Sequence, residues 1–285
     1  MKLVHTVKEL TQETGAARAQ GKQIGLVPTM GALHSGHASL IKRSASENGF
    51  TVVSVFVNPT QFNDPNDLKT YPRTLDSDCK LAEEAGADIV FAPSVEEIYP
   101  EPDTRHFSYP PLDTVMEGVY RPGHFNGVCQ IVSKLLTMAA PDRAYFGEKD
   151  FQQLAIIKAM VKDLQLPVEI VPCAEVREPS GLAISSRNAL LSPDERKTAV
   201  NISKTLAESL NYAHKHTLKE TQKWVIDTIN AIDGLKVQYY EIVDGDTLQP
   251  LAKWDDAPYV VGCITVYCGA KPIRLIDNIK YKQDN

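Results

Sequence analysis

The sequence predicts an α/β fold, with a doubly wound, Rossmann-like parallel sheet in an N-terminal domain and a smaller α+β C-terminal domain. Short apolar runs rich in Val, Ile and Phe alternate with segments of helical periodicity, and polar residues do not interrupt the runs. Strands that are buried on both faces of a parallel sheet have this composition. The pattern changes near residue 175, so we expect domains at residues 1–175 and 176–285.

The expected parallel sheet contains five strands that are joined by helices. The apolar runs lie at 24–27, 51–57, 88–92, 144–146 and 168–171. Helical patterns cover 38–48, 74–85, 127–139 and 151–164. This β-α-β-α order implies right-handed crossovers between parallel strands.

The C-terminal region begins with a different pattern of two helices followed by strands. Ser192-Pro193-Asp194-Glu195 is a capping box with proline at the first helical position, and it predicts a helix that runs to about His214. Thr217-Leu218-Lys219-Glu220 repeats the capping box and predicts a second helix. Strands are expected at 237–243 and 259–267, with a possible third at 274–278.

Composition disfavours several classes of protein. The 285 residues carry 30 basic and 36 acidic side chains, a net charge of −6, which disfavours binding to nucleic acid or to an anionic membrane surface. No apolar run approaches the roughly 18 residues of a membrane span, and the N-terminus has no long apolar core, so we expect a cytoplasmic protein. The five cysteines form no C-x-x-C pair, and we expect them to be reduced and mostly buried.

A strand-to-helix turn at residues 28–37 is the most informative segment. It contains two glycines and two histidines, His34 and His37, and it follows the apolar run 24–27. In an open α/β sheet such a turn binds ligands, because the N–H groups at the start of the helix are unpaired and attract phosphate. Two other interpretations stay open, a metal pair that lacks its third ligand and two surface histidines.

Three further polar segments are expected near the same end of the sheet. Asn58-Pro59-Thr60-Gln61-Phe62 offers two amides to a polar substrate, although a proline turn explains it equally well. Gly147-Glu148-Lys149-Asp150 offers a lysine to phosphate, although charged turns are common. In Ile184-Ser185-Ser186-Arg187-Asn188, two hydroxyls and a guanidinium could bind oxyanions on a mobile loop, or form a helix cap with a solvated arginine.

Six motifs in order carry a resemblance to a known family over nearly the whole chain. They are residues 28–37, 56–62, 71–74 (Tyr-Pro-Arg-Thr), 121–125 (Arg-Pro-Gly-His-Phe), 146–153 and 185–188. Together they closely resemble the pantothenate synthetases, also called pantoate–beta-alanine ligases. His34-Ser35-Gly36-His37 resembles the HxGH signature of the wider nucleotidyltransferase group, and Ile184-Ser185-Ser186-Arg187 stands where that group has a mobile KMSKS-like loop.

The resemblance implies an ATP-dependent ligase that condenses pantoate with beta-alanine, using Mg²⁺ and forming AMP, pyrophosphate and a pantoyl-adenylate intermediate. It also implies a homodimer, an ATP- and pantoate-binding catalytic domain at residues 1–175, and a C-terminal lid. Of the residues that match the motifs, His37 would be the catalytic acid, and His34, Lys149, Ser185, Ser186 and Arg187 would hold phosphates. Gln61 would contact pantoate and beta-alanine, and Gln153 would contact pantoate. The ATP site would consist of Met30, Gly31, Ala32, Leu33, His34, Ser35, Gly36, His37, Gly147, Glu148, Lys149, Asp150, Val176, Ile184, Ser185, Ser186 and Arg187.

Several points remain open on the sequence alone. The family commonly has Asp-Gly before the Ser-Ser-Arg-Asn segment, whereas this chain has Ser180-Gly181 after Pro179, which affects the expected stiffness of the loop. Tyr71, Arg121 and His124 match the family without an assigned role, and Asp78 is a possible neighbour of the metal.

Two rival functions share part of this pattern. A nucleotidylyltransferase would use His34 and His37 but would stop after transferring AMP to a phosphate. A noncatalytic nucleotide sensor would keep the glycines and the lysine without needing two histidines. The amide pair Gln61 and Gln153 favours a small polyhydroxy acid as substrate.

Overall fold

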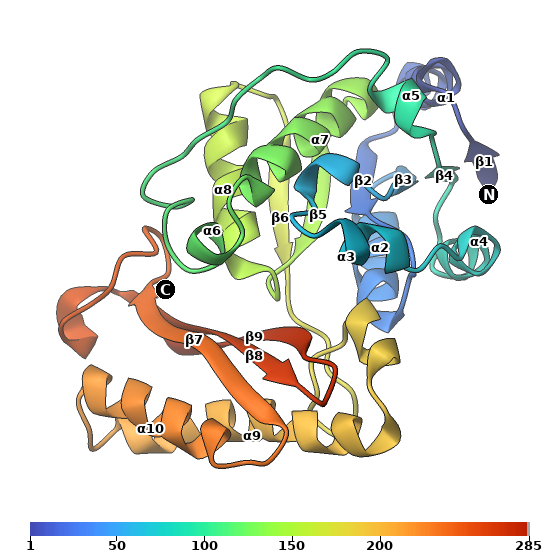
Figure 1. The fold of residues 1–285 in the computed structure, drawn as a ribbon. Coiled ribbons are helices and arrows are strands. Elements are labelled where there is room, and N and C mark those ends of the chain that lie inside the picture. The colour runs from blue at the N-terminus through green and yellow to red at the C-terminus, as the bar shows by residue number, and fades with distance from the viewer. Residues whose placement is uncertain (284–285) are drawn as a thin grey trace. The chain divides into compact units, whose positions relative to one another are not determined.

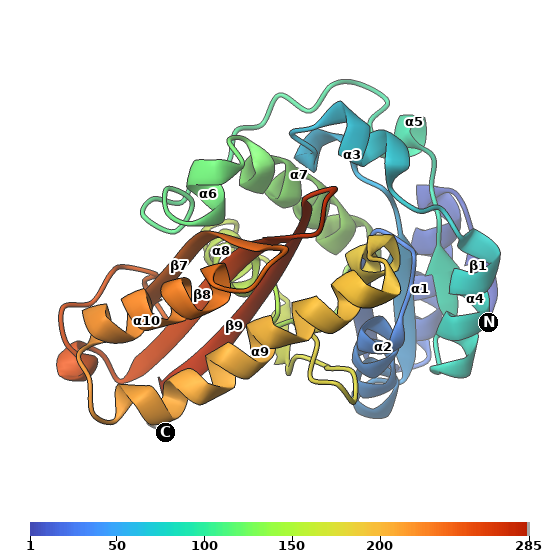
Figure 2. The ribbon, with the colours of Figure 1, turned by 60° about the horizontal axis from the view of Figure 1, so that its bottom comes forward.

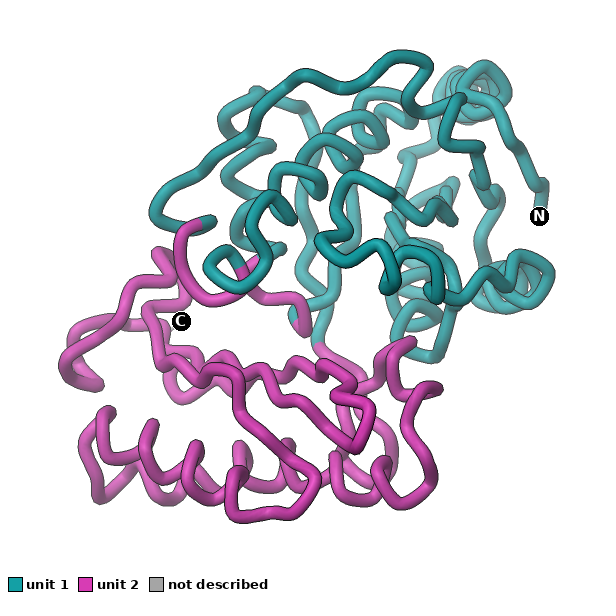
Figure 3. Tube along the Cα trace, in the orientation of Figure 1, with its two compact units in different colours: residues 1–113, 118–148, 153–174 teal, residues 114–117, 149–152, 175–285 magenta. Residues whose placement is uncertain are grey.

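The computed structural model describes residues 1–283 and divides the chain into two compact units (Figure 3). Unit 1 consists of residues 1–113, 118–148 and 153–174. Unit 2 consists of residues 114–117 and 149–152 together with the chain from Glu175 onward. Two short segments that precede Glu175 therefore group with the C-terminal part of the chain.

Unit 1 is built on a parallel sheet (Figure 1). In the part of the chain that the structure describes, this sheet has six strands. Each pair of neighbouring strands runs parallel, with Leu26 opposite Val52 in the central pair. The spatial order is β1 (Lys2–Val4), β4 (Ile89–Phe91), β3 (Phe50–Val55), β2 (Ile24–Thr29), β5 (Arg143–Gly147) and β6 (Glu169–Cys173). This is the doubly wound arrangement that the sequence predicts.

Helices cover both faces of this sheet because its strands are apolar on both faces. One face, with Leu26 and Phe146, packs against α1 (Val7–Ala19), α7 (His124–Ala139) and α8 (Phe151–Asp163). The opposite face, with Val27 and Tyr145, packs against α2 (Ser35–Glu47) and α4 (Leu75–Glu84). Neighbouring residues of one strand thus enter separate cores, as the period of two in a strand requires. The shorter elements are η1 (Pro59–Gln61), α3 (Pro65–Thr70), α5 (Val95–Ile98) and α6 (Glu117–Tyr120).

Unit 2 contains an antiparallel sheet in the order β7 (Leu235–Asp244), β8 (Tyr259–Cys268) and β9 (Ile273–Gln283). One face of the sheet packs on α9 (Pro193–Ala213) and α10 (Leu218–Asn230), which run beneath the strands in Figure 1 and in front of them in Figure 2. The two predicted capping boxes, at Ser192 and at Thr217, are present and begin these helices. Unit 2 also contains two short 3₁₀-helices, η2 (Ser186–Leu190) and η3 (Trp254–Asp256).

The other face of this sheet holds residues 114–117 through a buried charge cluster. The Arg274 guanidinium donates to both oxygens of Glu117, at 2.6 and 2.5 Å. Tyr239 and Thr265 also donate to Glu117 Oε1, at 2.8 and 3.0 Å. Burial and the neighbouring Glu117 carboxylate raise the pKa of Tyr239 above its ordinary value, so the phenol remains a donor.

Most expected elements are confirmed, and their bounds differ by a few residues. The second predicted strand stops at Val55 and not at Val57, and the possible third C-terminal strand extends from Ile273 to Gln283. Both β1 and α1 were missing from the sequence-based prediction. The five cysteines are free, and all except Cys79 are buried.

Candidate active site

The switch point of the sheet in unit 1 lies between β2 and β5. These two strands pair in parallel, and the helices that follow them, α2 and α8, cover opposite faces of the sheet. Ligands of doubly wound proteins bind in the crevice outside the carboxyl ends of two such strands. The turn 30–37 follows the end of β2, and Gly147 and Glu148 lie at the end of β5.

The turn after β2 has an unusual backbone. Gly31 and Ala32 both adopt positive φ, +83° and +50°. The N–H of Gly31 donates to the Thr29 hydroxyl at 3.1 Å. The carboxylate of Asp78, on α4, accepts the N–H groups of Ala32 and Leu33 at 3.1 and 2.8 Å. Asp78 is therefore bound to the turn by hydrogen bonds, which the sequence did not reveal.

The two histidines of the turn lie at the start of α2 and contact each other. His34 is the N-cap residue, and its backbone N–H donates to Nδ1 of His37 at 3.3 Å. The two rings stack with centroids 4.0 Å apart. Because Nδ1 of His37 accepts this bond, the proton of the neutral ring is on Nε2, which is a donor. The first turn of α2 contains no acidic residue, so nothing in it opposes an anion at this helix terminus.

A second group of polar residues in unit 1 surrounds Gln61 on η1. Its Nε2 donates to the sulfur of Met30 at 3.3 Å, and its Oε1 accepts from the Asn58 amide at 3.1 Å. Asn58 is buried, and its amide also donates to the carbonyl of Gly127. His124 donates from Nδ1 to the carbonyl of Gln61 at 2.9 Å. The side chain and the backbone of Gln61 thus have different hydrogen-bond partners.

The structure shows the surroundings of three residues that the sequence left without a role, Tyr71, Arg121 and His124. His124 is buried and, with Nδ1 donating, its Nε2 accepts from the Arg121 guanidinium at 3.1 Å. His124 is therefore a neutral bridge between Arg121 and the Gln61 backbone. Tyr71 packs edge to face against Phe62, with ring centroids 5.7 Å apart.

The remaining unit 1 candidates lie near the ends of β5 and α8. The Glu148 N–H donates to the Cys173 carbonyl at 2.8 Å, which continues the pairing of β5 with β6 beyond Gly147. Gln153 lies in the first turn of α8 and is half-buried.

Unit 2 contains the other candidates, which are Lys149, Asp150, Val176 and residues 184–187. The carbonyl of Lys149 accepts from the Asn278 side chain at 3.2 Å. The Ile184 N–H donates to the Val176 carbonyl at 3.1 Å and closes the loop between them. Ser185 caps η2, because its hydroxyl accepts from the Arg187 N–H at 3.2 Å. Ser185 thus has the helix-capping role that the sequence left as an alternative.

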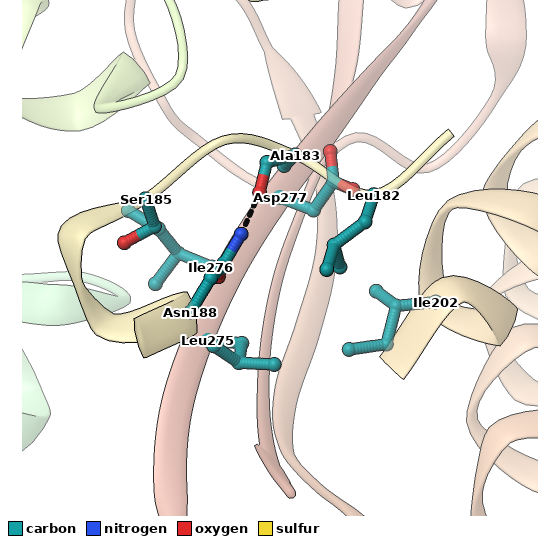
Figure 4. A pocket seen from close by; sticks show the side chains of 8 residues that line it. All are labelled: Leu182, Ala183, Ser185, Asn188, Ile202, Leu275, Ile276 and Asp277. Atoms are coloured by element: carbon teal, nitrogen blue, oxygen red, sulfur yellow. Dashed lines mark hydrogen bonds between the residues drawn. The ribbon is translucent and has the colours of Figure 1, made fainter. Parts of the chain in front are cut away.

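A small cavity lies behind this loop (Figure 4). Its volume of about 10 Å³ suits a single water molecule and is too small for a substrate. The Asn188 amide beside it donates to the Ala183 carbonyl at 2.9 Å, as the dashed line in Figure 4 shows. The lining consists of Leu182, Ala183, Ser185, Asn188, Ile202, Leu275, Ile276 and Asp277.

A buried charge cluster lies beside the loop 177–183 within unit 2. Arg177 donates to both oxygens of Asp277, at 2.8 and 2.7 Å, and also pairs with Glu175. Burial, followed by the charge of Asp277, raises the pKa of Glu175 well above its ordinary range, although Arg177 and Lys149 oppose this shift.

Nothing in the described residues forms a protein cage for a metal ion. Within residues 1–283, no three His, Cys, Asp or Glu side chains come together in a group that could hold one. The carboxylate of Asp78, which the sequence left as a possible neighbour of the metal, accepts hydrogen bonds from the turn. Mg²⁺ is commonly held by substrate phosphates and water. The helices of the described chain include none that is long and apolar enough to cross a membrane.

A doubly wound sheet with a glycine- and histidine-bearing turn at its switch point defines a nucleotide-binding α/β enzyme. The chain belongs to a particular family of this class, the pantoate–beta-alanine ligases, whose family model matches residues 2–280. A pantothenate synthetase of Bacteroides thetaiotaomicron is 66% identical over 283 residues, covering 99% of this chain and 100% of that protein. The resemblance and the fold class inferred from the sequence are confirmed.

Solved structures agree with this assignment. The pantothenate synthetase of Thermus thermophilus is 42% identical, with a TM-score of 0.92, and the match covers 99% of this chain and 100% of that one. The pantoate-beta-alanine ligase of Francisella tularensis, complexed with beta-gamma ATP and beta-alanine, is 36% identical with a TM-score of 0.82, and the match covers 99% and 98% of the two chains.

Proposed function

We propose that this protein condenses (R)-pantoate with beta-alanine to form pantothenate, in a reaction that converts ATP to AMP and pyrophosphate. Membership of the ligase family and the Francisella complex support the three substrates. The observation that carries the chemistry is the His34–His37 turn at the switch point, where a helix terminus and a fixed Nε2 donor suit a phosphoryl group.

In the first step, a carboxylate oxygen of pantoate attacks the α-phosphorus of ATP. A new O–P bond forms, the bond to the β-phosphate oxygen breaks, and pyrophosphate leaves. Negative charge increases on the phosphoryl oxygens in the transition state, and preorganised donors stabilise it. His37 would donate from Nε2, and His34, Lys149, Ser185, Ser186 and Arg187 would bind phosphate oxygens. Mg²⁺ would enter with the ATP phosphates.

In the second step, the amine of beta-alanine attacks the acyl carbon of pantoyl adenylate. The C–N bond forms, the bond from carbon to the AMP oxygen breaks, and the amine releases a proton. Gln61 would contact pantoate and beta-alanine, and Gln153 would contact pantoate. Because water also hydrolyses an acyl adenylate, closure of the loop 184–187 would protect the intermediate.

The rest of the ATP site would consist of the turn 30–37, Gly147, Glu148, Asp150, Val176 and Ile184. The protein would act as a cytoplasmic homodimer with the C-terminal domain, residues 176–285, as a lid over residues 1–175. Sedimentation or light scattering tests the dimer, and a concentration-independent monomer would contradict it.

Oxygen labelling tests the proposed chemistry. With ¹⁸O in the pantoate carboxylate, one labelled oxygen should appear in AMP, because that oxygen bridges carbon and phosphorus in the intermediate. An acyl phosphate formed by attack at the γ-phosphorus would give ADP and labelled inorganic phosphate instead. ADP formation, or no turnover with all three substrates present, would exclude the proposed reaction.

A further inference from the structure

Asp78 contacts the turn at 30–37 from a distant part of the sequence. Asp78 lies on α4 and is only 2% exposed. Its two carboxylate oxygens accept three hydrogen bonds. The donors are the N–H groups of Ala32 and Leu33, at 3.1 and 2.8 Å, and the Thr74 hydroxyl at 3.1 Å. The Thr74 hydroxyl lies one helical turn earlier and orients the carboxylate.

The turn needs a stabilising contact from elsewhere in the chain, because one of its non-glycine residues has an unfavourable backbone conformation. Ala32 has φ +50°, a left-handed conformation that its Cβ disfavours and glycine tolerates. Gly31 precedes it at φ +83°, and a Cβ there would lie 3.0 Å from Asp78 Oδ2. Successive N–H groups in such a turn converge on a single anion. Here the anion is a side chain of the protein itself.

The conformation of the turn determines where the two histidines stand. Leu33 is followed directly by His34, the N-cap residue of α2, whose N–H sets the orientation of the His37 ring. A rotation at Ala32 or Leu33 would therefore move both imidazoles. The hydrogen bonds of Asp78 to Ala32 and Leu33 oppose this rotation.

We propose that Asp78 is a positioning residue for the adenylation step, which acts by holding Ala32 in its left-handed conformation and not by binding metal. The inference rests on the proposed function only for its kinetic readout. Its structural part concerns the backbone of the turn alone.

The first experiment compares Asp78→Asn with Asp76→Asn, a matched change at an exposed position of the same helix. An asparagine at 78 turns an NH₂ group toward one of the donors, so one hydrogen bond is lost. Pyrophosphate–ATP exchange with pantoate should slow by roughly 10- to 100-fold in Asp78→Asn, because small misplacements of reacting groups are costly. The Mg²⁺ concentration for half-maximal rate should not change, and Asp76→Asn should match the unmodified enzyme.

A rescue experiment separates positioning from a general structural role. Glycine at 32 adopts positive φ without a steric cost, so Asp78→Asn/Ala32→Gly should recover at least several-fold of the lost rate. A helix-packing role of Asp78 would not respond to a change at residue 32. If Asp78→Asn does not fold, Thr74→Val removes only the hydroxyl that orients the carboxylate, and a smaller loss with the same rescue is expected.

Hydrogen exchange of residues 30–37 provides a readout that does not depend on the reaction. The amides of Ala32 and Leu33 should exchange faster in Asp78→Asn than in Asp76→Asn, even if the proposed ligase activity fails. Three results with Asp78→Asn would overturn the proposal. They are unchanged hydrogen exchange at Ala32 and Leu33, an unreduced rate of pyrophosphate–ATP exchange with pantoate, and no recovery of that rate when Ala32→Gly is added. A raised Mg²⁺ requirement with full rate at saturating Mg²⁺ would identify Asp78 as a metal ligand instead.

Discussion

The backbone N–H of His34 donates to Nδ1 of His37, and the two rings stack with centroids 4.0 Å apart. This contact leaves the proton of neutral His37 on Nε2. His34 thus fixes which nitrogen of His37 can donate to a phosphoryl oxygen, in addition to any phosphate contact of its own.

Replacing His37 by three residues tests which nitrogen acts. His37→Ala should lower the rate of adenylation by ~10²–10³, the usual effect of removing one preorganised oxyanion donor. His37→Gln places an NH₂ group near the Nε2 position and should retain more activity than His37→Asn, which replaces only Nδ1. Pyrophosphate–ATP exchange measures this step, with the exposed His5→Ala as control. A more active asparagine variant would show that Nδ1 is the working atom.

Gly127 on α7 permits the close approach of α7 to η1, which carries Gln61. A Cβ at Gly127 would lie 2.4 Å from the Thr60 carbonyl oxygen and 2.7 Å from the Gln61 nitrogen. Because these are backbone atoms, Gly127→Ala should displace η1, destabilise the protein by ~1–3 kcal/mol and raise KM for pantoate.

The control for this variant is another helical glycine. Gly15→Ala on α1 meets nothing within 4 Å and should stabilise the protein by ~0.5–1 kcal/mol. Urea unfolding measures both changes. If Gly127→Ala is destabilised but its KM for pantoate is unchanged, η1 is not part of the pantoate-binding pocket.

Most strands of unit 1 were predictable because burial on both faces leaves an apolar run, as in residues 24–27 of β2. The edge strand Lys2–Val4 was not, since only Val4 is buried in its three residues. Helix α1 has only three buried residues, Leu10, Thr14 and Ala17, so its periodicity is weak. The capping box formed by Thr6 and Glu9 was the available signal for this helix.

The candidate site residues were predicted from local sequence motifs. The contacts that support them come from residues far away in the sequence. Asp78 lies 46 residues from Ala32, and Arg274 lies 157 residues from Glu117, so no local pattern could relate them. Gly127 and His124 support Gln61 from another helix in the same way. The sequence identifies residue types suited to ATP and pantoate, whereas the neighbours that hold them depend on the tertiary fold.

The raised pKa of Glu175 predicts a pH dependence of stability. The unfolded chain releases this proton near the ordinary pKa of about 4.3, whereas the folded chain keeps it to higher pH. Unfolding therefore releases a proton. The contribution of protonated Glu175 to the free energy of unfolding is complete below its pKa in the unfolded chain, and it is lost as the pH rises through its pKa in the folded protein.

Urea unfolding from pH 5 to pH 8 measures this contribution as a fall in the free energy of unfolding of at most about 1.4 kcal/mol per pH unit. Glu175→Gln has no proton to release and should reduce the slope, whereas Glu208→Gln, at an exposed position of α9, should leave it unchanged. An identical slope in Glu175→Gln would mean that Glu175 is ionised in the folded protein.

The ion pair between Arg274 and Glu117 should contribute far more to stability than an exposed pair. The Glu117 carboxylate is buried, so Arg274→Ala leaves a charge without its main partner and should destabilise the protein by ~3–5 kcal/mol. The double variant Glu117→Gln/Arg274→Met removes both charges and should recover much of this loss, because an isolated buried charge costs more than an absent pair.

Lys223→Ala, which breaks an exposed pair with Asp227 one turn along α10, should cost only ~0.3–0.5 kcal/mol. Urea unfolding of the three variants provides the comparison. Similar losses for Arg274→Ala and Lys223→Ala would show that the Glu117 carboxylate is solvated and not held in the sheet.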